Sequence, residues 1–317
     1  MSEERQGWRA WIHSGRIEYA GYEWLLMRVA FAMVAWPTLD ARHLANFKGL
    51  SDPHGMAQFV DLTWMLESGV QAGIAIVAVL HLILYVLNVV PLWACTVLLV
   101  TQSLLGTVVN SQGAIHHTSQ IVSFVLIGHV VGYGILLCKK RASEALDWRG
   151  FELPGRLKLS APAEVIYSCQ QLIAVAYVVS GISKLIRSQG EWISSIPNIV
   201  LQLEKTRMMA YYNSLEPPPE TAVWAIAMIT SYPVLAKVFF AAGLGLELFA
   251  FVALFNRKFM AVWGIALIMM HVSITQIMNL GFFYNKWLLA IFWVNVPFWC
   301  LVVANLKLKR GAVLVSA

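Results

Sequence analysis

The segment Tyr177-Val178-Val179-Ser180-Gly181-Ile182-Ser183-Lys184-Leu185 places a lysine near the end of an apolar helix that is long enough to cross a bilayer. An ammonium group in hydrocarbon costs about 2.5–3.5 kcal/mol on insertion scales. Such a lysine is tolerated when it lines a polar cavity, finds a partner or loses its proton. A neutral amine is a base, so the last alternative would give this segment a chemical role as well as a structural one.

The composition places this helix in a membrane protein. Of the 317 residues, 59% are hydrophobic and 13% are charged, whereas soluble domains carry about 25% charged residues. The charges gather in short clusters between long apolar runs, which is typical of a polytopic helical membrane protein. The net charge of +6 comes mainly from loop lysines and arginines that set topology, so we expect no nucleic-acid partner.

Eight apolar runs predict an all-α polytopic membrane protein with a single transmembrane domain over residues 1–317. Residues 186–232 are expected to form an outer segment. Its last part, 220–232, reads as a short outer helix or a re-entrant piece, because Tyr232-Pro233 interrupts the apolar run. The expected spans cover residues 22–39, 70–90, 92–110, 117–138, 163–185, 233–255, 260–278 and 287–306.

The distribution of lysine and arginine supports eight spans with both termini in the cytoplasm. If the N-terminus lies inside, 14 of the 23 cations fall on inner segments, 6 fall on outer segments and the other three lie within spans. Cytoplasmic loops carry an excess of lysine and arginine, so this asymmetry favours the eight-span arrangement. We expect a multi-pass membrane protein.

Ionisable residues at membrane depth are the first functional candidates. Tyr177 and Ser180 precede Lys184 by seven and four residues, so all three share one helix face. Burial would favour the neutral amine and so supply a base near neutral pH. The alternative is a lysine that extends its amine to the membrane interface.

Histidines supply further candidates. His271 lies in the middle of the seventh expected span, and Thr275 and Asn279 continue a polar stripe towards its outer end. Such a stripe in an apolar helix must face protein or water. His116 and His117 open the fourth span, where interfacial histidines are the alternative interpretation, and residues about 100° apart cannot both face one cavity.

Other intramembrane polar residues carry weaker predictions. Glu247 lies deep in the sixth span, where a carboxylate needs a cation or a proton. His81 and His129 are lone histidines that fit a structural role. The histidines show no HxH, HxxxH or HExxH spacing, so we expect no metal site.

Three segments resemble a known family. Ser180-Gly181-Ile182-Ser183-Lys184-Leu185, followed by Glu191-Trp192-Ile193, resembles the small-Gly-apolar-x-Lys-Leu…Trp motif in the membrane domain of vitamin K-dependent gamma-carboxylase. The segment from His271 through Gly281-Phe282-Phe283 resembles the histidine helix of that domain. Glu247-Leu248-Phe249 before Asn256-Arg257-Lys258 is similar to the related bacterial group, the horizontally transferred transmembrane (HTTM) family. This resemblance implies a bacterial inner (plasma) membrane.

The resemblance implies a quinone enzyme. Lys184 would be the base that acts on a reduced, vitamin K-like quinone, which then reacts with oxygen. His271, with His116 or His117, would orient or protonate groups around that quinone. The expected catalytic residues are thus Lys184, His271, His117 and His116, and the expected cofactor-binding residues are Tyr177, Ser180, Trp192, Thr275 and Asn279.

The expected activity is a quinol- and oxygen-dependent modification of a peptide or small substrate at the outer membrane face, with carboxylation by a lyase as one form. The expected partners are membrane lipid, a lipid quinone and a secreted peptide. Two alternatives remain open. One is a non-catalytic membrane partner in the maturation or export of a secreted peptide, as in the sporulation-delaying protein B group, and the other is a lipid- or quinone-binding protein.

Overall fold

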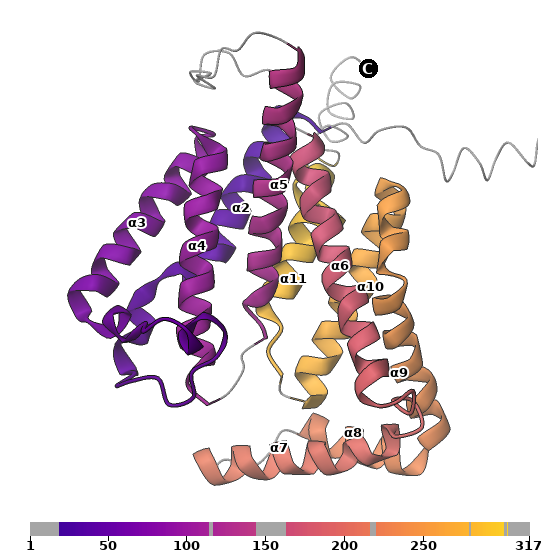
Figure 1. Cartoon of the computed structure of the whole chain (residues 1–317). Helices are drawn as coiled ribbons and strands as arrows, with labels where there is room; N and C mark the ends of the chain where they lie inside the picture. Colours follow the sequence, from indigo (N-terminus) through magenta and orange to yellow (C-terminus); the bar gives the residue numbers. More distant parts are fainter. Residues whose placement is uncertain are drawn as a thin grey trace, which may run out of the picture.

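The computed structural model describes residues 19–113, 117–143, 163–215, 220–278, 280–300 and 303, and the regular structure of this part of the chain is helical (Figure 1). Short 3-10 turns occupy Ala41–Asn46, Gly55–Gln58 and Thr63–Leu66 between the first two helices, and Ala250–Phe255 after α9. The helices are α2 (Gly21–Leu39), α3 (Ser68–Val86), α4 (Pro91–Asn110), α5 (Gln120–Ser143), α6 (Ala163–Arg187), α7 (Ile199–Ser214), α8 (Glu220–Ser231), α9 (Pro233–Leu248), α10 (Arg257–Met278) and α11 (Phe283–Leu289).

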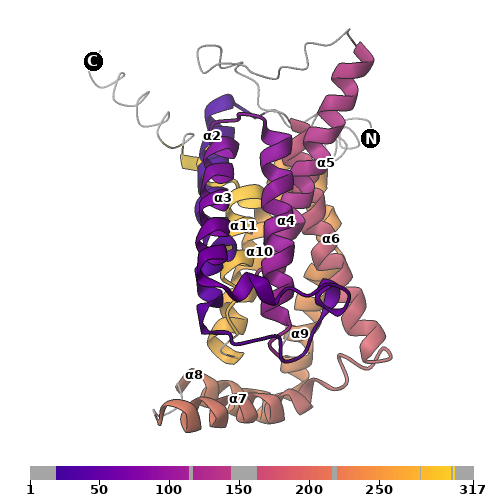
Figure 2. The ribbon, with the colours of Figure 1, turned by 60° about the vertical axis from the view of Figure 1, so that its left-hand side comes forward.

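Most helices stand side by side in one bundle. α2 to α6 and α9 to α11 form the bundle, and α7 and α8 run across one of its ends (Figures 1 and 2). We call this the covered end, and the other the opposite end. α6 reaches the covered end at Arg187 and α9 leaves it at Pro233, so the chain between them forms a layer over the helix ends.

The apolar helices make this a membrane protein. In the described chain, α3, α4, α5, α6 and α10 are long and apolar enough to cross a membrane, and the bent pair α8 and α9 adds a sixth if it is counted as one span. α2 and α11 complete the bundle without meeting that test of length and composition. The positions of the expected runs agree with the helices to within a few residues, except in the last run.

The expected interruption at Tyr232-Pro233 is confirmed. The helical segments Val223–Ser231 and Pro233–Leu248 meet at an angle of 110°. Proline has no N–H to continue the hydrogen bonds of α8, but it suits the first turn of a new helix. The chain therefore turns from the layer at the covered end into the bundle at this point.

The last expected span, 287–306, is wrong as a single helix. α11 begins earlier, at Phe283, and a π-helical turn follows it at Ala290–Val294. The break comes at Asn295, which has a left-handed φ of 58°, and residues 296–300 are helical again. Side chains satisfy carbonyl groups in this break: Gln170 donates to the Phe292 carbonyl (2.8 Å) and Trp299 donates to that of Val294 (2.9 Å). Contacts from another helix thus stabilise a break that hydropathy does not reveal.

Glycines allow α5 and α6 to approach closely. A Cβ added at Gly128 would lie 2.6 Å from the Cα of Cys169, and one added at Gly132 would lie 2.5 Å from the Cα of Val165. Small residues commonly permit such backbone contact between membrane helices. This pair therefore forms a tightly packed centre against which α2, α3 and α11 are placed.

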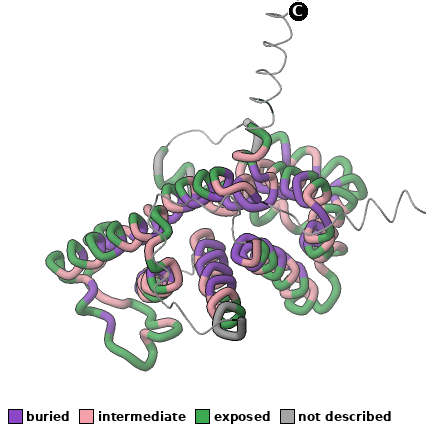
Figure 3. The backbone as a smooth tube through the Cα atoms, turned by 90° about the horizontal axis from the view of Figure 1, so that it is seen from above, coloured by how far each residue is buried: buried purple, intermediate pink, exposed green. Residues whose placement is uncertain are grey.

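Burial follows the bundle geometry. Viewed along the helices, buried residues gather on the faces that meet and exposed residues lie on the outer faces (Figure 3). Large apolar side chains such as Val179, Ile186, Val262 and Ile265 are exposed on these outer faces. In a soluble protein such a surface would be costly, but in a membrane it contacts lipid.

Candidate functional site

A buried tyrosine–histidine pair joins α6 to α10. The hydroxyl of Tyr177 lies 2.7 Å from Nε2 of His271, and the two residues are 4% and 3% exposed. Asn285 of α11 places Nδ2 3.5 Å from the same hydroxyl. Nδ2 of Asn285 can only donate, so the phenol accepts from it. Among the described residues the phenol proton has no acceptor other than Nε2 of His271, so we assign the hydrogen bond as one that Tyr177 donates to Nε2.

That pattern leaves one nitrogen of His271 open. A neutral imidazole that accepts at Nε2 carries its proton on Nδ1. Within the described chain, Nδ1 of His271 is buried and has no hydrogen-bond partner. The ring is held in place by Phe282, which stacks on it with a centroid separation of 4.7 Å. His271 therefore presents a fixed and unused N–H donor.

An ion pair lies further along α6, towards the covered end. Nζ of Lys184 contacts Oε2 of Glu247 on α9. The carboxylate side chain is 6% exposed and that of the lysine is 33% exposed. The Lys184 amine also lies 5.8 Å from the ring centroid of Trp192, a cation–π contact. At Gly181, one turn before Lys184, α6 meets Leu248 of α9, where an added Cβ would lie 2.9 Å from a methyl carbon.

The structure changes the interpretation of Lys184. An isolated neutral amine was the expectation that gave this residue its role as a base. Instead Lys184 has a carboxylate partner, which is another of the ways in which a lysine is tolerated at membrane depth. The same contact supplies the cation that Glu247 needs.

The two pairs are arranged along one face of α6. Tyr177 and Lys184 are seven residues apart, which is two helical turns and about 10 Å along the axis. α9 and α10 present Glu247 and His271 to this face. The expectation that Lys184 and His271 lie in one region fits this arrangement, with Tyr177 rather than Lys184 in contact with the imidazole.

The other candidates differ in their surroundings. Trp192 lies beside Lys184, as its place in the motif implies. Thr275 uses its hydroxyl to donate to the carbonyl oxygens of His271 (2.8 Å) and Leu280 (3.0 Å), so its proton stabilises the end of α10. Ser180 is half-buried, and no hydrogen bond joins its side chain to another candidate among the described residues.

Of the two histidines expected at the start of α5, the described one, His117, does not join this cluster. His117 is exposed and its Nδ1 lies 3.2 Å from Oε1 of Gln120. Among the described residues it makes no contact with Lys184 or His271. His116 and Asn279 lie outside the described residues.

Sequence reasoning missed a second buried tyrosine–histidine pair in the bundle core. The hydroxyl of Tyr85 lies 2.8 Å from Nε2 of His129, and Nδ1 of His129 lies 2.8 Å from the Val125 carbonyl. Cys169 of α6 also contacts Nδ1, at 3.3 Å. Both nitrogens are satisfied within the protein, which agrees with the structural role expected for a lone histidine.

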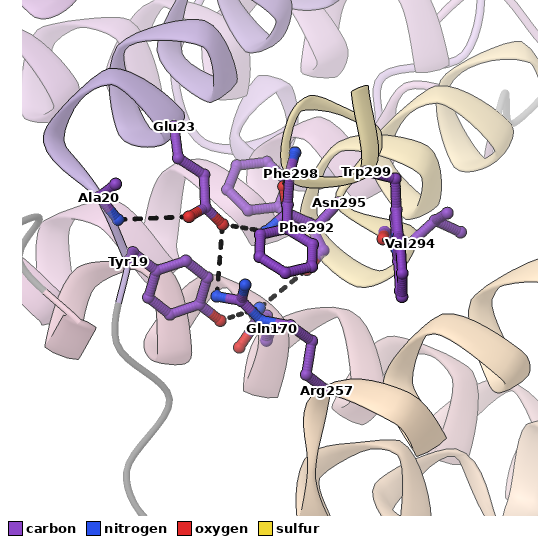
Figure 4. Close-up of polar contacts among 10 residues, drawn as sticks. All are labelled: Tyr19, Ala20, Glu23, Gln170, Arg257, Phe292, Val294, Asn295, Phe298 and Trp299. Carbon is purple, nitrogen blue, oxygen red and sulfur yellow. Dashed lines mark hydrogen bonds and ion pairs between the residues drawn. The ribbon is translucent and has the colours of Figure 1, made fainter. Parts of the chain in front are cut away.

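A polar cluster near the opposite end was also missed (Figure 4). Glu23 of α2 accepts from Asn295 and pairs with Arg257 at 3.3 Å. The guanidinium carbon of Arg257 lies 4.1 Å from the ring centroid of Phe298 and 4.9 Å from that of Tyr19. The cluster joins the first bundle helix to α10 and to the break after α11, so its geometry supports a structural role.

Comparisons with known proteins add no relative. No family model matches this chain, and neither the curated proteins nor the solved structures gave a match.

Proposed function

We propose that this chain is a membrane enzyme of the HTTM and gamma-carboxylase-like class. It uses a reduced lipid quinone and oxygen to modify a peptide or small substrate at the outer face of a bacterial inner membrane. One observation carries the proposal: two pairs of proton-exchanging groups, Tyr177 with His271 and Lys184 with Glu247, lie on one face of α6.

The proposal includes an eight-span topology with both termini in the cytoplasm. Two of the eight spans do not meet the test of length and composition. They are α2 and the segment formed by α11 and the residues that follow it. The covered end then faces outwards. Arg257 and Lys258 at the start of α10 face the cytoplasm, which agrees with the positive-inside rule.

The residues fit a quinol headgroup in one specific respect. A quinone or quinol has oxygen atoms at both ends of its ring, and the open Nδ1–H of His271 is a buried donor without an acceptor. An oxygen of the headgroup would supply that acceptor. When bound, the reduced quinone supplies the electrons for the reaction with oxygen.

Lys184 and Glu247 then act as the proton-accepting unit. Nζ and Oε2 are in direct contact, so a proton can move from the amine to the carboxylate without any large motion. In a low-dielectric site the neutral carboxylic acid and neutral amine are stabilised relative to the charged carboxylate and ammonium. The neutral amine is the base, and its partial exposure leaves it within reach of a ligand.

His271 stabilises charge on the bound ligand, and Tyr177 positions His271. The Nδ1–H of His271 stabilises negative charge that develops on a ligand oxygen, as preorganised donors do in other enzymes. The hydrogen bond from Tyr177 fixes the tautomer that places the proton on Nδ1. Trp192 and the layer of α7 and α8 limit the access of water from the covered end.

A second candidate function is a non-catalytic partner in peptide maturation or export, or a lipid- or quinone-binding protein. Exposed apolar side chains on the covering helices favour it: Leu201 and Tyr212 on α7 are 74% and 68% exposed, and Trp224 on α8 is 61% exposed. Such a surface fits a hydrophobic peptide or lipid. This candidate requires binding without consumption of quinol or oxygen.

Oxygen uptake separates the two candidates. Purified protein in proteoliposomes is given a reduced menaquinone, and dissolved oxygen is followed with an electrode. We expect uptake above the rate of protein-free liposomes, and its loss in Lys184→Ala. Lys237→Ala is the matched control, because Lys237 also lies in a bundle helix and makes no ion pair among the described residues.

The two candidate functions predict different results in this assay. Uptake that Lys184→Ala abolishes and Lys237→Ala retains supports the enzyme. Quinol binding without uptake, or full uptake in Lys184→Ala, contradicts it.

A further inference from the structure

A polar cavity lies between α4 and the start of α5, beneath the loop that holds Gly55–Gln58. Its volume is about 190 Å³. In the described chain its lining contains no aspartate, glutamate, lysine or arginine. The helical part of the lining includes Gln102, Ser103, Gly106, Thr107 and Asn110 of α4, and Gln120 and Ser123 of α5.

Gln102 marks this cavity as a binding site. Its side chain is almost completely enclosed, with 2% of the residue exposed. Its Oε1 is buried and has no hydrogen-bond partner in the described structure. An unpaired buried acceptor costs about 1–3 kcal/mol, and such a group calls for a water, an ion or a ligand.

Two hydroxyl groups on the α4 wall of the cavity are left to accept hydrogen bonds. Ser103 donates its hydroxyl proton to the Leu99 carbonyl, and Thr107 donates its own to the Ser103 carbonyl, both at 2.8 Å. A hydroxyl has one proton, so each retains only lone pairs for the cavity. The side-chain amides of Gln102 and Asn110 on the same wall carry both a donor nitrogen and an acceptor oxygen.

The α5 wall adds a donor. Oε1 of Gln120 accepts from Nδ1 of His117, because an amide oxygen cannot donate. The Nε2 group of Gln120 is left to donate. A ligand that suits this lining must both donate and accept hydrogen bonds.

We infer that this cavity binds a neutral polyhydroxyl group. Hydroxyl groups donate and accept together, as the two walls require. A cation is disfavoured, because the lining offers no carboxylate to pair with a desolvated charge. One water occupies about 30 Å³ of liquid, so the cavity suits a group the size of a few waters, such as glycerol or the glycosyl headgroup of a lipid. This inference is independent of the proposed quinol chemistry.

Gly106 offers a direct test. A Cβ added there would meet no atom within 4 Å, so Gly106→Leu extends a side chain into open space beside the cavity. Gly73→Leu on α3 is the matched control, since an added Cβ is equally free there and Gly73 does not line the cavity. Gln102→Leu removes the unpaired oxygen and should leave stability equal or higher.

The measurement is saturation-transfer NMR of free glycerol with the full chain in phosphatidylcholine nanodiscs. We expect a signal in the wild type and in Gly73→Leu, and a signal at least five-fold weaker in Gly106→Leu and Gln102→Leu. Equal signals in the wild type and Gly106→Leu would overturn the inference.

The source of the group is tested by native mass spectrometry of protein taken from membranes that contain glucosyl diacylglycerol. Retention of that lipid by the wild type and its loss in Gly106→Leu assign the cavity to a headgroup. Glycerol binding without lipid retention assigns it to a free polyol. If the wild type shows neither, the cavity holds only water and the inference fails.

Discussion

The molecule contains two buried tyrosine–histidine pairs that look alike until the second nitrogen of each ring is examined. Tyr85 with His129 and Tyr177 with His271 have nearly equal oxygen-to-nitrogen separations, 2.8 and 2.7 Å. In the first pair Nδ1 reaches the Val125 carbonyl, whereas in the second it has no partner among the described residues. A histidine with both nitrogens satisfied holds helices together, and one with an open nitrogen is available to a ligand.

Their surroundings support the same distinction. His129 is fully buried among aromatic rings, with Phe31 at 5.0 Å and Trp24 at 5.9 Å between centroids. His271 lies on the face of α6 that also holds the ion pair of Lys184 and Glu247. Burial alone therefore does not identify the functional residue, because both histidines are buried.

The largest expected effect follows from replacing the open histidine. His271→Phe keeps a ring that can stack on Phe282 but removes the Nδ1 donor. A preorganised hydrogen-bond donor contributes about 10²–10³-fold to a rate, so quinol-dependent oxygen uptake per folded molecule should fall by about that factor. The substitution also leaves the hydroxyl of Tyr177 without its acceptor, so we expect a loss of about 1–3 kcal/mol in the free energy of unfolding as well. Retained uptake would show that the open nitrogen has no catalytic use.

We expect replacement of His129, whose two ring nitrogens both have partners, to affect stability rather than oxygen uptake. His129→Phe removes two hydrogen bonds and leaves the hydroxyl of Tyr85 buried without its partner. We expect a loss of about 2–4 kcal/mol in the free energy of unfolding, from the lost bonds and the unsatisfied hydroxyl. Denaturant unfolding in detergent measures this change. If His129→Phe unfolds like the wild type but loses oxygen uptake, His129 has the functional role and the assignment is contradicted.

The sequence predicted the helices well because long apolar runs and the Tyr232-Pro233 interruption are local signals. It could not predict that Lys184 meets Glu247 or that Tyr177 meets His271, since these partners are 63 and 94 residues apart. The polar stripe after His271 separated it from the lone His129, but the sequence could not show which ring nitrogen has a partner, because ring orientation depends on neighbouring helices. The break at Asn295 was missed for the same reason, as Gln170 of α6 helps to stabilise it.

The smallest expected effects come from the two tyrosines. Tyr85→Phe and Tyr177→Phe each remove one hydroxyl, which costs about 1 kcal/mol for a hydrogen bond. In the core pair this should appear only as a small loss in unfolding free energy. In the other pair it should also lower oxygen uptake by several-fold, because the tautomer of His271 is no longer fixed. If oxygen uptake falls equally in Tyr85→Phe and Tyr177→Phe, the two tyrosine–histidine pairs do not differ in function.

The most direct measurement is ¹⁵N NMR of the histidine-labelled protein in lipid, recorded with and without a reduced menaquinone. His271→Phe and His129→Phe assign the two signals. The account predicts that the Nδ1 signal of His271 shifts when the quinol is added and that the signal of His129 does not. A His271 signal that ignores the quinol, at concentrations that support oxygen uptake, would contradict the central role of its open nitrogen.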